Sequence, residues 1–179
     1  MMTSMAIVRE KERGNIELLL STPITGMQIM LGKIFLYVFI GIIQVLLILL
    51  IAVFVFGIPF VGSLLWLSVC VLAFIATNLA LGLCISSISQ NQLQAVQLSI
   101  FIFLPSLLLS GFMFPFDGMP KWAQIISEIL PLTHFLRLIR AIILKGTEIK
   151  FIYVDLVWLL GLFALLLLGA TLNFKKTLD

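Results

Sequence analysis

IFLYVFIGIIQVLLILLIAVFVF, residues 34–56, is a predominantly apolar run that contains no Lys, Arg, Asp or Glu. As a helix with a rise of about 1.5 Å per residue, it is long enough to cross the roughly 30 Å hydrocarbon core of a bilayer. Lipid cannot satisfy free backbone N–H and C=O groups, so a run of this kind has to form a helix. The sequence therefore predicts a transmembrane helix over 34–56.

Three further runs have the same character, at 64–86, 95–114 and 153–172, and the one charged residue in them is Asp155. The 179 residues are 62% hydrophobic and 11% charged, against about half and about a quarter in soluble domains. A soluble fold of this size could not hide so much apolar surface. The sequence predicts an all-α polytopic membrane protein, a single domain over 1–179 with four transmembrane helices in the lipid bilayer.

Several classes of function are disfavoured by what the sequence lacks. A net charge of +3 is modest and indicates no nucleic-acid partner. The chain has one histidine, so a two-histidine metal motif is impossible, and we expect no metal site. Gly-x-Ser-x-Gly and phosphate-binding loops are missing, and Cys70 and Cys84 lie within one apolar run as expected of buried small hydrophobes. We therefore expect no catalytic residues, and no cofactor in this chain.

The segment 9–22 mixes charges of both signs with apolar residues at helical spacing. Arg13 and Glu17 stand one helical turn apart and can pair. Pro23 disfavours helical geometry at the preceding residue, so the helix should end there. We expect a short amphipathic helix on the membrane surface, which serves either to bind a partner or simply to lie in the lipid headgroups.

Polar residues inside the spans have two possible roles. Asn78 lies near the middle of the second span among small residues, which is typical of helix–helix packing but also compatible with lining a transport pathway. Gln97 makes one end of the third span polar, and Pro105 should kink it. Asn78, Gln97 and Pro105 are therefore candidates for either packing or the pathway.

The segment 115–150 is more organised than a loop. Pro120 and Pro131 can each open a helix, and Gly146 can end one. Apolar residues recur at helical spacing after Pro131, and three polar ones fall between them, His134, Arg137 and Arg140. Helices too short to span predict a re-entrant or interfacial helical hairpin. An unpaired arginine costs about 3 kcal/mol at the bilayer centre, so partners are needed, the candidates being Glu128, Glu148 and Asp155. For His134 we favour local hydrogen bonding over a proton relay.

Two groups of residues resemble a known family. The first is Arg9-Glu10-Lys11-Glu12-Arg13-Gly14-Asn15-Ile16-Glu17-Leu18-Leu19, followed by Thr22-Pro23 and Gly32-Lys33. The second is Met119-Pro120-x-Trp122, then Pro131-Leu132-Thr133-His134-Phe135, Arg137, Arg140 and Leu144-Lys145-Gly146. Both resemble the permeases of bacterial type-2 ATP-binding-cassette (ABC) transporters, and the chain departs from the pattern at Asn15, where Thr is usual. It is similar to the C-terminal half of such a permease, which holds the last four of six spans.

The resemblance implies a transmembrane permease subunit of an ATP-driven exporter. Segment 9–22 would be the coupling helix that docks on a separate cytoplasmic ABC ATPase subunit, so ATP would act through that partner and the chain itself would hydrolyse nothing. A second permease copy or a paralogue would complete a dimer. The location implied is the bacterial inner (plasma) membrane, with both termini cytoplasmic and segment 115–150 external. The implied coupling residues are Arg9, Glu10, Glu12, Arg13, Gly14, Glu17 and Pro23.

Basic residues do not decide the orientation, because they divide almost evenly between the two ends of the spans. The alternative function is that of a truncated or accessory four-span membrane protein without transport activity of its own. A membrane enzyme is disfavoured, because no span centre carries an ionisable group. The sequence does not indicate a substrate.

Overall fold

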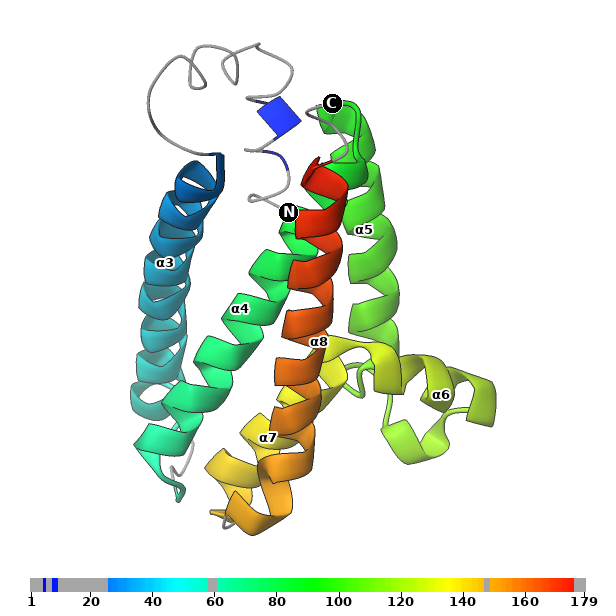
Figure 1. The fold of residues 1–179 in the computed structure, drawn as a ribbon. Coiled ribbons are helices and arrows are strands. Elements are labelled where there is room, and N and C mark those ends of the chain that lie inside the picture. The colour runs from blue at the N-terminus through cyan, green and yellow to red at the C-terminus, as the bar shows by residue number, and fades with distance from the viewer. Residues whose placement is uncertain (1–4, 6–7, 10–25, 58–60, 147–148, 176–179) are drawn as a thin grey trace.

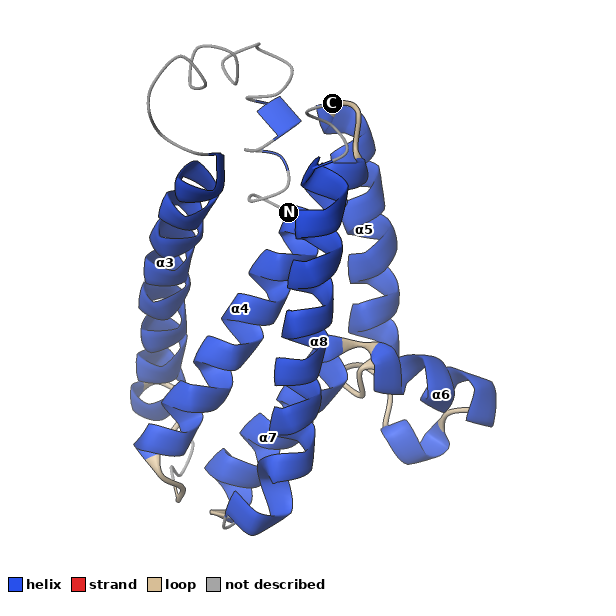
Figure 2. Ribbon diagram, viewed as in Figure 1, coloured by secondary structure: helices blue, strands red, loops and turns tan. Residues whose placement is uncertain are grey.

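The computed structural model describes residues 5, 8–9, 26–57, 61–146 and 149–175, and within these ranges the regular structure is helical (Figures 1 and 2). Four helices are long and apolar enough to cross a membrane, which confirms the expected fold class. The helices in chain order are α3 Gly26–Phe54, α4 Leu64–Ile88, α5 Gln92–Leu109, the 3-10 helix η1 Phe116–Gly118, α6 Lys121–Ile129, α7 Pro131–Lys145 and α8 Ile149–Lys175.

Helix α4 lies at the centre and packs most extensively against α8 (Figure 1). Three small residues spaced along one face of α4, Ala73, Thr77 and Ala80, are all buried. The Thr77 hydroxyl donates to the Ala73 carbonyl at 2.7 Å and lies 3.2 Å from the Leu159 carbonyl of α8. Small side chains let two helix backbones approach closely enough for such a contact. The small residues beside Asn78 are therefore the ones that are buried in the packing of α4.

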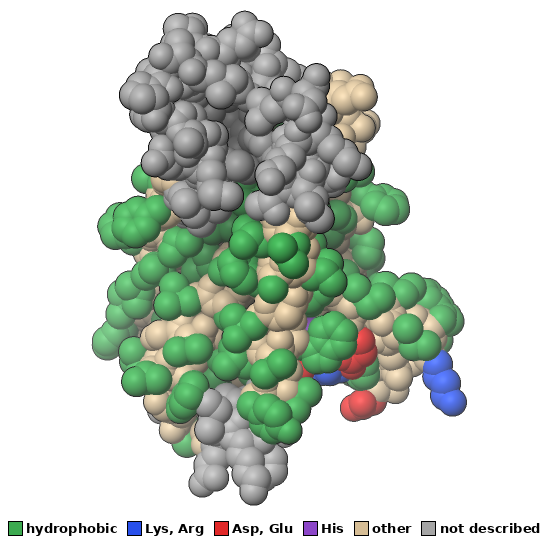
Figure 3. Space-filling view, in the orientation of Figure 1, with side chains coloured by type: hydrophobic (Ala, Val, Ile, Leu, Met, Phe, Trp, Pro, Cys, Tyr) green, Lys and Arg blue, Asp and Glu red, His purple; other side chains and the backbone are tan. Residues whose placement is uncertain are grey.

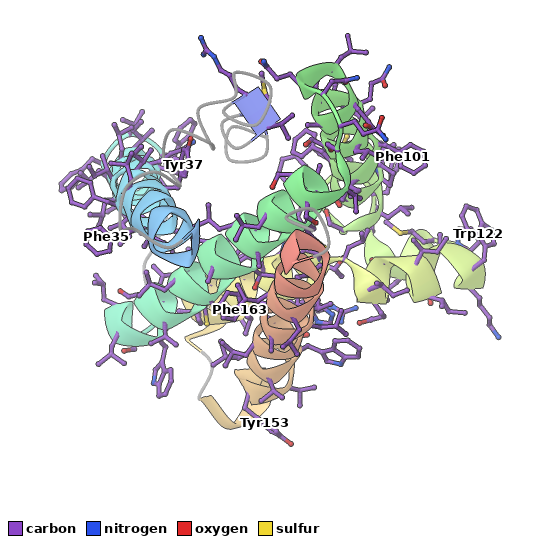
Figure 4. The ribbon with its side chains drawn as sticks, turned by 45° about the horizontal axis from the view of Figure 1, so that its top comes forward. Phe35, Tyr37, Phe101, Trp122, Tyr153 and Phe163 are labelled. Carbon is purple, nitrogen blue, oxygen red and sulfur yellow. The ribbon has the colours of Figure 1, made fainter. Side chains whose placement is uncertain are left out.

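Helix α3 stands at one side of the other helices and packs mainly against α4 (Figure 1). None of the residues from Phe35 to Phe54 is buried within the chain. Phe35 points away from the other helices, as does Phe101 on α5 (Figure 4). The face in Figure 3 is hydrophobic over most of its described surface, and its charged side chains gather beside α6. A soluble protein rarely exposes so large an apolar patch, so this surface is suited to contact with lipid.

The third span is shorter than the sequence predicts. Helix α5 begins at Gln92, where the Asn91 side chain accepts a hydrogen bond from the Gln94 amide at 2.8 Å. It ends at Leu109 rather than at residue 114, because Ser110 closes the last turn and Gly111 follows at φ +84°. A positive φ cannot continue a right-handed helix. The expectation of a helix over 95–114 was wrong at its C-terminal end.

The segment 115–150 contains two separate helices, as its prolines predict. Helix α6 follows Pro120, and α7 has Pro131 in its first turn. The Gln124 side chain ties α6 to η1 by donating to the carbonyls of Phe116 and Met119 at 3.2 and 3.0 Å. Helix α7 ends at Lys145, and Gly146 after it adopts the left-handed conformation expected of a glycine that caps a helix.

Candidate functional site

Helix α7 packs along one half of α4. Its C-terminal end lies against the α3–α4 turn, where the Val61 amide donates to the Ile143 carbonyl at 3.3 Å. Its N-terminal part reaches Phe74, whose ring stacks on Phe135 with centroids 3.9 Å apart. Phe74 lies ten residues after Leu64, which is roughly 15 Å along α4 at about 1.5 Å per residue. Helix α7 therefore extends from one end of α4 to near its middle.

An apolar core formed by α4, α7 and α8 holds α7 in this position. Leu138 and Ile142 of α7 are buried against Leu67 and Cys70 of α4 and against Leu159 of α8. Burying one such aliphatic side chain contributes about 1.5–3 kcal/mol. Helix α7 is thus a packed element between two spans rather than an exposed loop.

Four ionisable side chains meet where α6, α7 and α8 come together, and we call Glu128, His134, Arg137 and Asp155 the α6–α8 charge cluster. The Arg137 guanidinium donates one hydrogen bond to each carboxylate oxygen of Glu128. The bond to Oε2 is 3.0 Å long. It also lies 3.8 Å from Asp155 Oδ1, and its guanidinium carbon is 4.6 Å from the centroid of the Phe116 ring. Bidentate pairing is the strongest arrangement available to an arginine and a carboxylate.

His134 is the buried member of the cluster, with 1% of its side chain exposed. Its Nδ1 lies 2.7 Å from Asp155 Oδ1, and its Nε2 lies 2.8 Å from the Glu128 carbonyl oxygen. The Trp158 ring stacks over it at a centroid distance of 5.6 Å. Burial alone lowers the pKa of His134, but the hydrogen bonds to Asp155 and to the Glu128 carbonyl, with the nearby carboxylates, raise it overall. His134 therefore makes the local hydrogen bonds that the sequence favours.

Two further hydrogen bonds fasten the same region to α5. The Ser127 hydroxyl donates to the Leu109 carbonyl at 2.6 Å and lies 3.1 Å from the Thr133 hydroxyl. Arg140 donates to the Gly111 carbonyl at 2.8 Å. Leu109 is the last residue of α5, so its carbonyl is one of those that the ending helix leaves without a helical partner, and Gly111 lies just beyond the helix.

A cavity of about 290 Å³ lies between α4 and α5, and Pro131 and Leu132 at the start of α7 form part of its wall. Most of its lining is apolar, and Asn78, Ser99, Ser106 and Pro131 also line it. The Asn78 amide nitrogen donates to the Phe74 carbonyl of its own helix at 2.9 Å, and Ser106 likewise donates to Ile102. The site can hold a mainly apolar group with few polar contacts.

The structure brings together only some of the residues expected from the sequence. Asn78 and Pro131 share the α4–α5 cavity, whereas Gln97 and Pro105 of α5 do not line it. Arg9 is helical and its side chain is exposed. The preceding residue, Val8, is buried against Ile85 and Ala95. The remaining coupling residues lie outside the described residues, namely Glu10, Glu12, Arg13, Gly14, Glu17 and Pro23.

Sequence reasoning missed one partner of Arg140 and one of the cluster. The Gly111 carbonyl carries no sequence signal, because every residue has such a group. Trp158 could have been found, since it lies one helical turn after Asp155 and so on the same face of its span. Among the described residues, no three His, Cys, Asp or Glu side chains are grouped so that they could hold a metal ion.

Comparison with known proteins identifies related sequences. The pattern described as "ABC-2 type transporter" matches residues 1–144. The chain is 38% identical over 180 residues to "Probable multidrug ABC transporter permease YbhS" of Escherichia coli K12, a match that covers 99% of this chain and 48% of the relative. It is 34% identical to "Probable multidrug ABC transporter permease YbhR" of the same strain, over 94% of this chain and 44% of the relative.

A eukaryotic protein is also similar. "ABC transporter G family member 20" of Dictyostelium discoideum is 32% identical over 151 residues, 83% of this chain and 20% of that protein. No solved structure matches the chain. The chain spans about half the length of the bacterial permeases it matches. Since the family pattern covers most of the chain and those permeases align with nearly all of it, this chain belongs to the ABC-2 type transporter family.

Proposed function

We propose that the chain forms part of the transmembrane permease subunit of an ATP-driven ABC exporter and works with a separate cytoplasmic ATPase. The observation that carries this proposal is the family match over residues 1–144, which includes the charged segment 9–22 before the first apolar helix. The chain itself hydrolyses no ATP, and ATP acts through the partner ATPase subunit. The subunit resides in the bacterial inner membrane and pairs with a second permease copy or a paralogue.

The described residues that flank segment 9–22 support this role. Val8 packs on Ile85 at the end of α4 and on Ala95 at the start of α5. Gly26 begins α3, and both points lie at the same end of the helix bundle (Figure 1). A segment that begins and ends beside these helices could pass a push from an ATPase into the bundle. We place this end, with both termini, in the cytoplasm.

Helix α7 supports a second part of the proposal. It ends beside the α3–α4 turn and begins near the middle of α4, so in a membrane crossed by α4 it enters one leaflet and does not leave on the other side. A short helix at this depth is allowed when it packs on protein, as α7 does on α4 and α8. We propose that α6 and α7 close the α4–α5 cavity from the outside.

A charge reversal tests the coupling role. Glu17→Lys should abolish co-purification of an ABC ATPase with the tagged protein from native membranes, while membrane insertion is retained. Lys121→Glu is the matched control, because Lys121 is an exposed charge at the start of α6. Co-purification at the unaltered yield in Glu17→Lys would contradict this role. If neither the unaltered protein nor the control retains an ATPase, the alternative of an accessory four-span protein is supported instead.

A further inference from the structure

We propose that His134 and Asp155 form a proton-binding site that controls how firmly α6 and α7 are held against α8. The proposal rests on the two acceptors that face the imidazole ring. Nε2 faces the Glu128 carbonyl oxygen at 2.8 Å, and Nδ1 faces the Asp155 carboxylate at 2.7 Å. It does not depend on the transport function, because it concerns contacts within this chain.

Counting protons shows why this arrangement needs one to be bound. A carbonyl oxygen can only accept, so Nε2 carries a hydrogen. A neutral imidazole would then present a lone pair at Nδ1 to the lone pairs of an ionised Asp155, which is repulsive at hydrogen-bond distance. The contact is attractive when one further proton lies between Nδ1 and Oδ1. The ring and the carboxylate therefore share a proton, with the imidazolium–carboxylate pair as one of its two forms.

Within the α6–α8 charge cluster, positive and negative charges balance only when this proton is present. Helix α6 contributes Glu128, α7 contributes Arg137, and α8 contributes Asp155, whereas Arg140 donates to the Gly111 carbonyl. Asp117 of η1 acts on Arg137 from nearby. Helices α4 and α5, which also pack against α7, contain no Lys, Arg, Asp, Glu or His. With His134 protonated, two cations face the two carboxylates of the cluster.

Loss of the proton leaves Arg137 as the one cation of the cluster for both carboxylates. It is 3.0 Å from a Glu128 oxygen and 3.8 Å from an Asp155 oxygen, so both would compete for it. Burial alone would lower the pKa of His134, but the hydrogen bonds to Asp155 and to the Glu128 carbonyl raise it above its ordinary 6.5 overall. The stabilisation is complete below pH 6.5 and is lost as the pH rises through the raised value.

The single histidine makes the site directly observable. The 179-residue chain is labelled with ¹⁵N-histidine, placed in lipid nanodiscs and titrated by NMR. We expect a doubly protonated ring at pH 6.5 and a midpoint above that of free histidine. Asp155→Asn should weaken proton binding about tenfold or more, because it removes the charge that favours the imidazolium. Lys121→Gln, at the exposed start of α6, is the control and should leave the midpoint unchanged.

Hydrogen exchange supplies the structural readout. After correction for the intrinsic pH dependence of exchange, amide protection across 132–144 should fall as the histidine titrates, and His134→Gln should remove this pH response. A neutral ring at pH 6.5 in the unaltered chain overturns the proposal even if no variant folds. So does an unchanged midpoint in a folded Asp155→Asn chain, or a pH response that persists in His134→Gln.

Discussion

Replacing Gly62 by alanine should destabilise the packing of α7, because this glycine lies directly against the end of that helix. An added Cβ would lie 2.2 Å from the Ile142 carbonyl oxygen, 2.8 Å from Ile142 Cγ2 and 2.9 Å from the Ile142 carbonyl carbon. Two of these three atoms belong to the α7 backbone, which cannot turn aside as a flexible side chain can. The turn and the end of α7 must therefore separate by roughly 1 Å to restore an ordinary contact, and overpacking of this kind costs about 1–3 kcal/mol.

The measurement is reversible unfolding of the chain in mixed micelles, combined with hydrogen exchange at residues 141–146. Gly161→Ala is the matched control, because Gly161 lies within α8 and a Cβ there meets nothing within 4 Å. In Gly62→Ala the midpoint should fall and the end of α7 should exchange faster, whereas Gly161→Ala should cause neither change. Equal stability of the two variants would refute the close approach of the α3–α4 turn to α7.

Two further predictions concern the spans. Thr77→Val should lower the free energy of unfolding by about 0.6 kcal/mol, because it removes the hydroxyl that contacts the Leu159 carbonyl of α8. Unfolding of this variant is compared with that of the exposed control Ser68→Ala, and equal losses of stability in the two would contradict the prediction. A membrane-impermeant thiol reagent added to whole cells should label a cysteine at position 118 but not one at 12 or 177, because we place Gly118 outside and both termini inside; the reverse pattern would invert the orientation.

The membrane-spanning helices were predictable because apolar length is decisive in lipid. The starts of α6 and α7 were also predictable, since Pro120 and Pro131 mark them, as Gly146 marks the end of α7. The end of α5 was not, because the apolar run continues to residue 114 and hydropathy does not register a backbone turn at Gly111.

Prediction of the site divides in the same way. Glu128 and Asp155 could be proposed as partners of the arginines, because few acids are available near them in the sequence. The pairing itself could not be predicted: Arg137 binds Glu128, His134 contacts Asp155, and Arg140 turns to a backbone carbonyl. That outcome depends on the angles between α6, α7 and α8, and the spacing of apolar residues in the sequence does not determine those angles.

The position of α7 between α4 and α8 sets an order of assembly during synthesis. Helix α7 leaves the ribosome before α8, yet Leu138 and Ile142 complete their packing on Leu159, which is translated later. Asp155, the acceptor for His134, also comes after the ring it binds. The segment 121–145 must therefore wait beside the translocon with part of its polar surface uncovered, and a nascent chain halted before residue 155 should hold α7 only loosely.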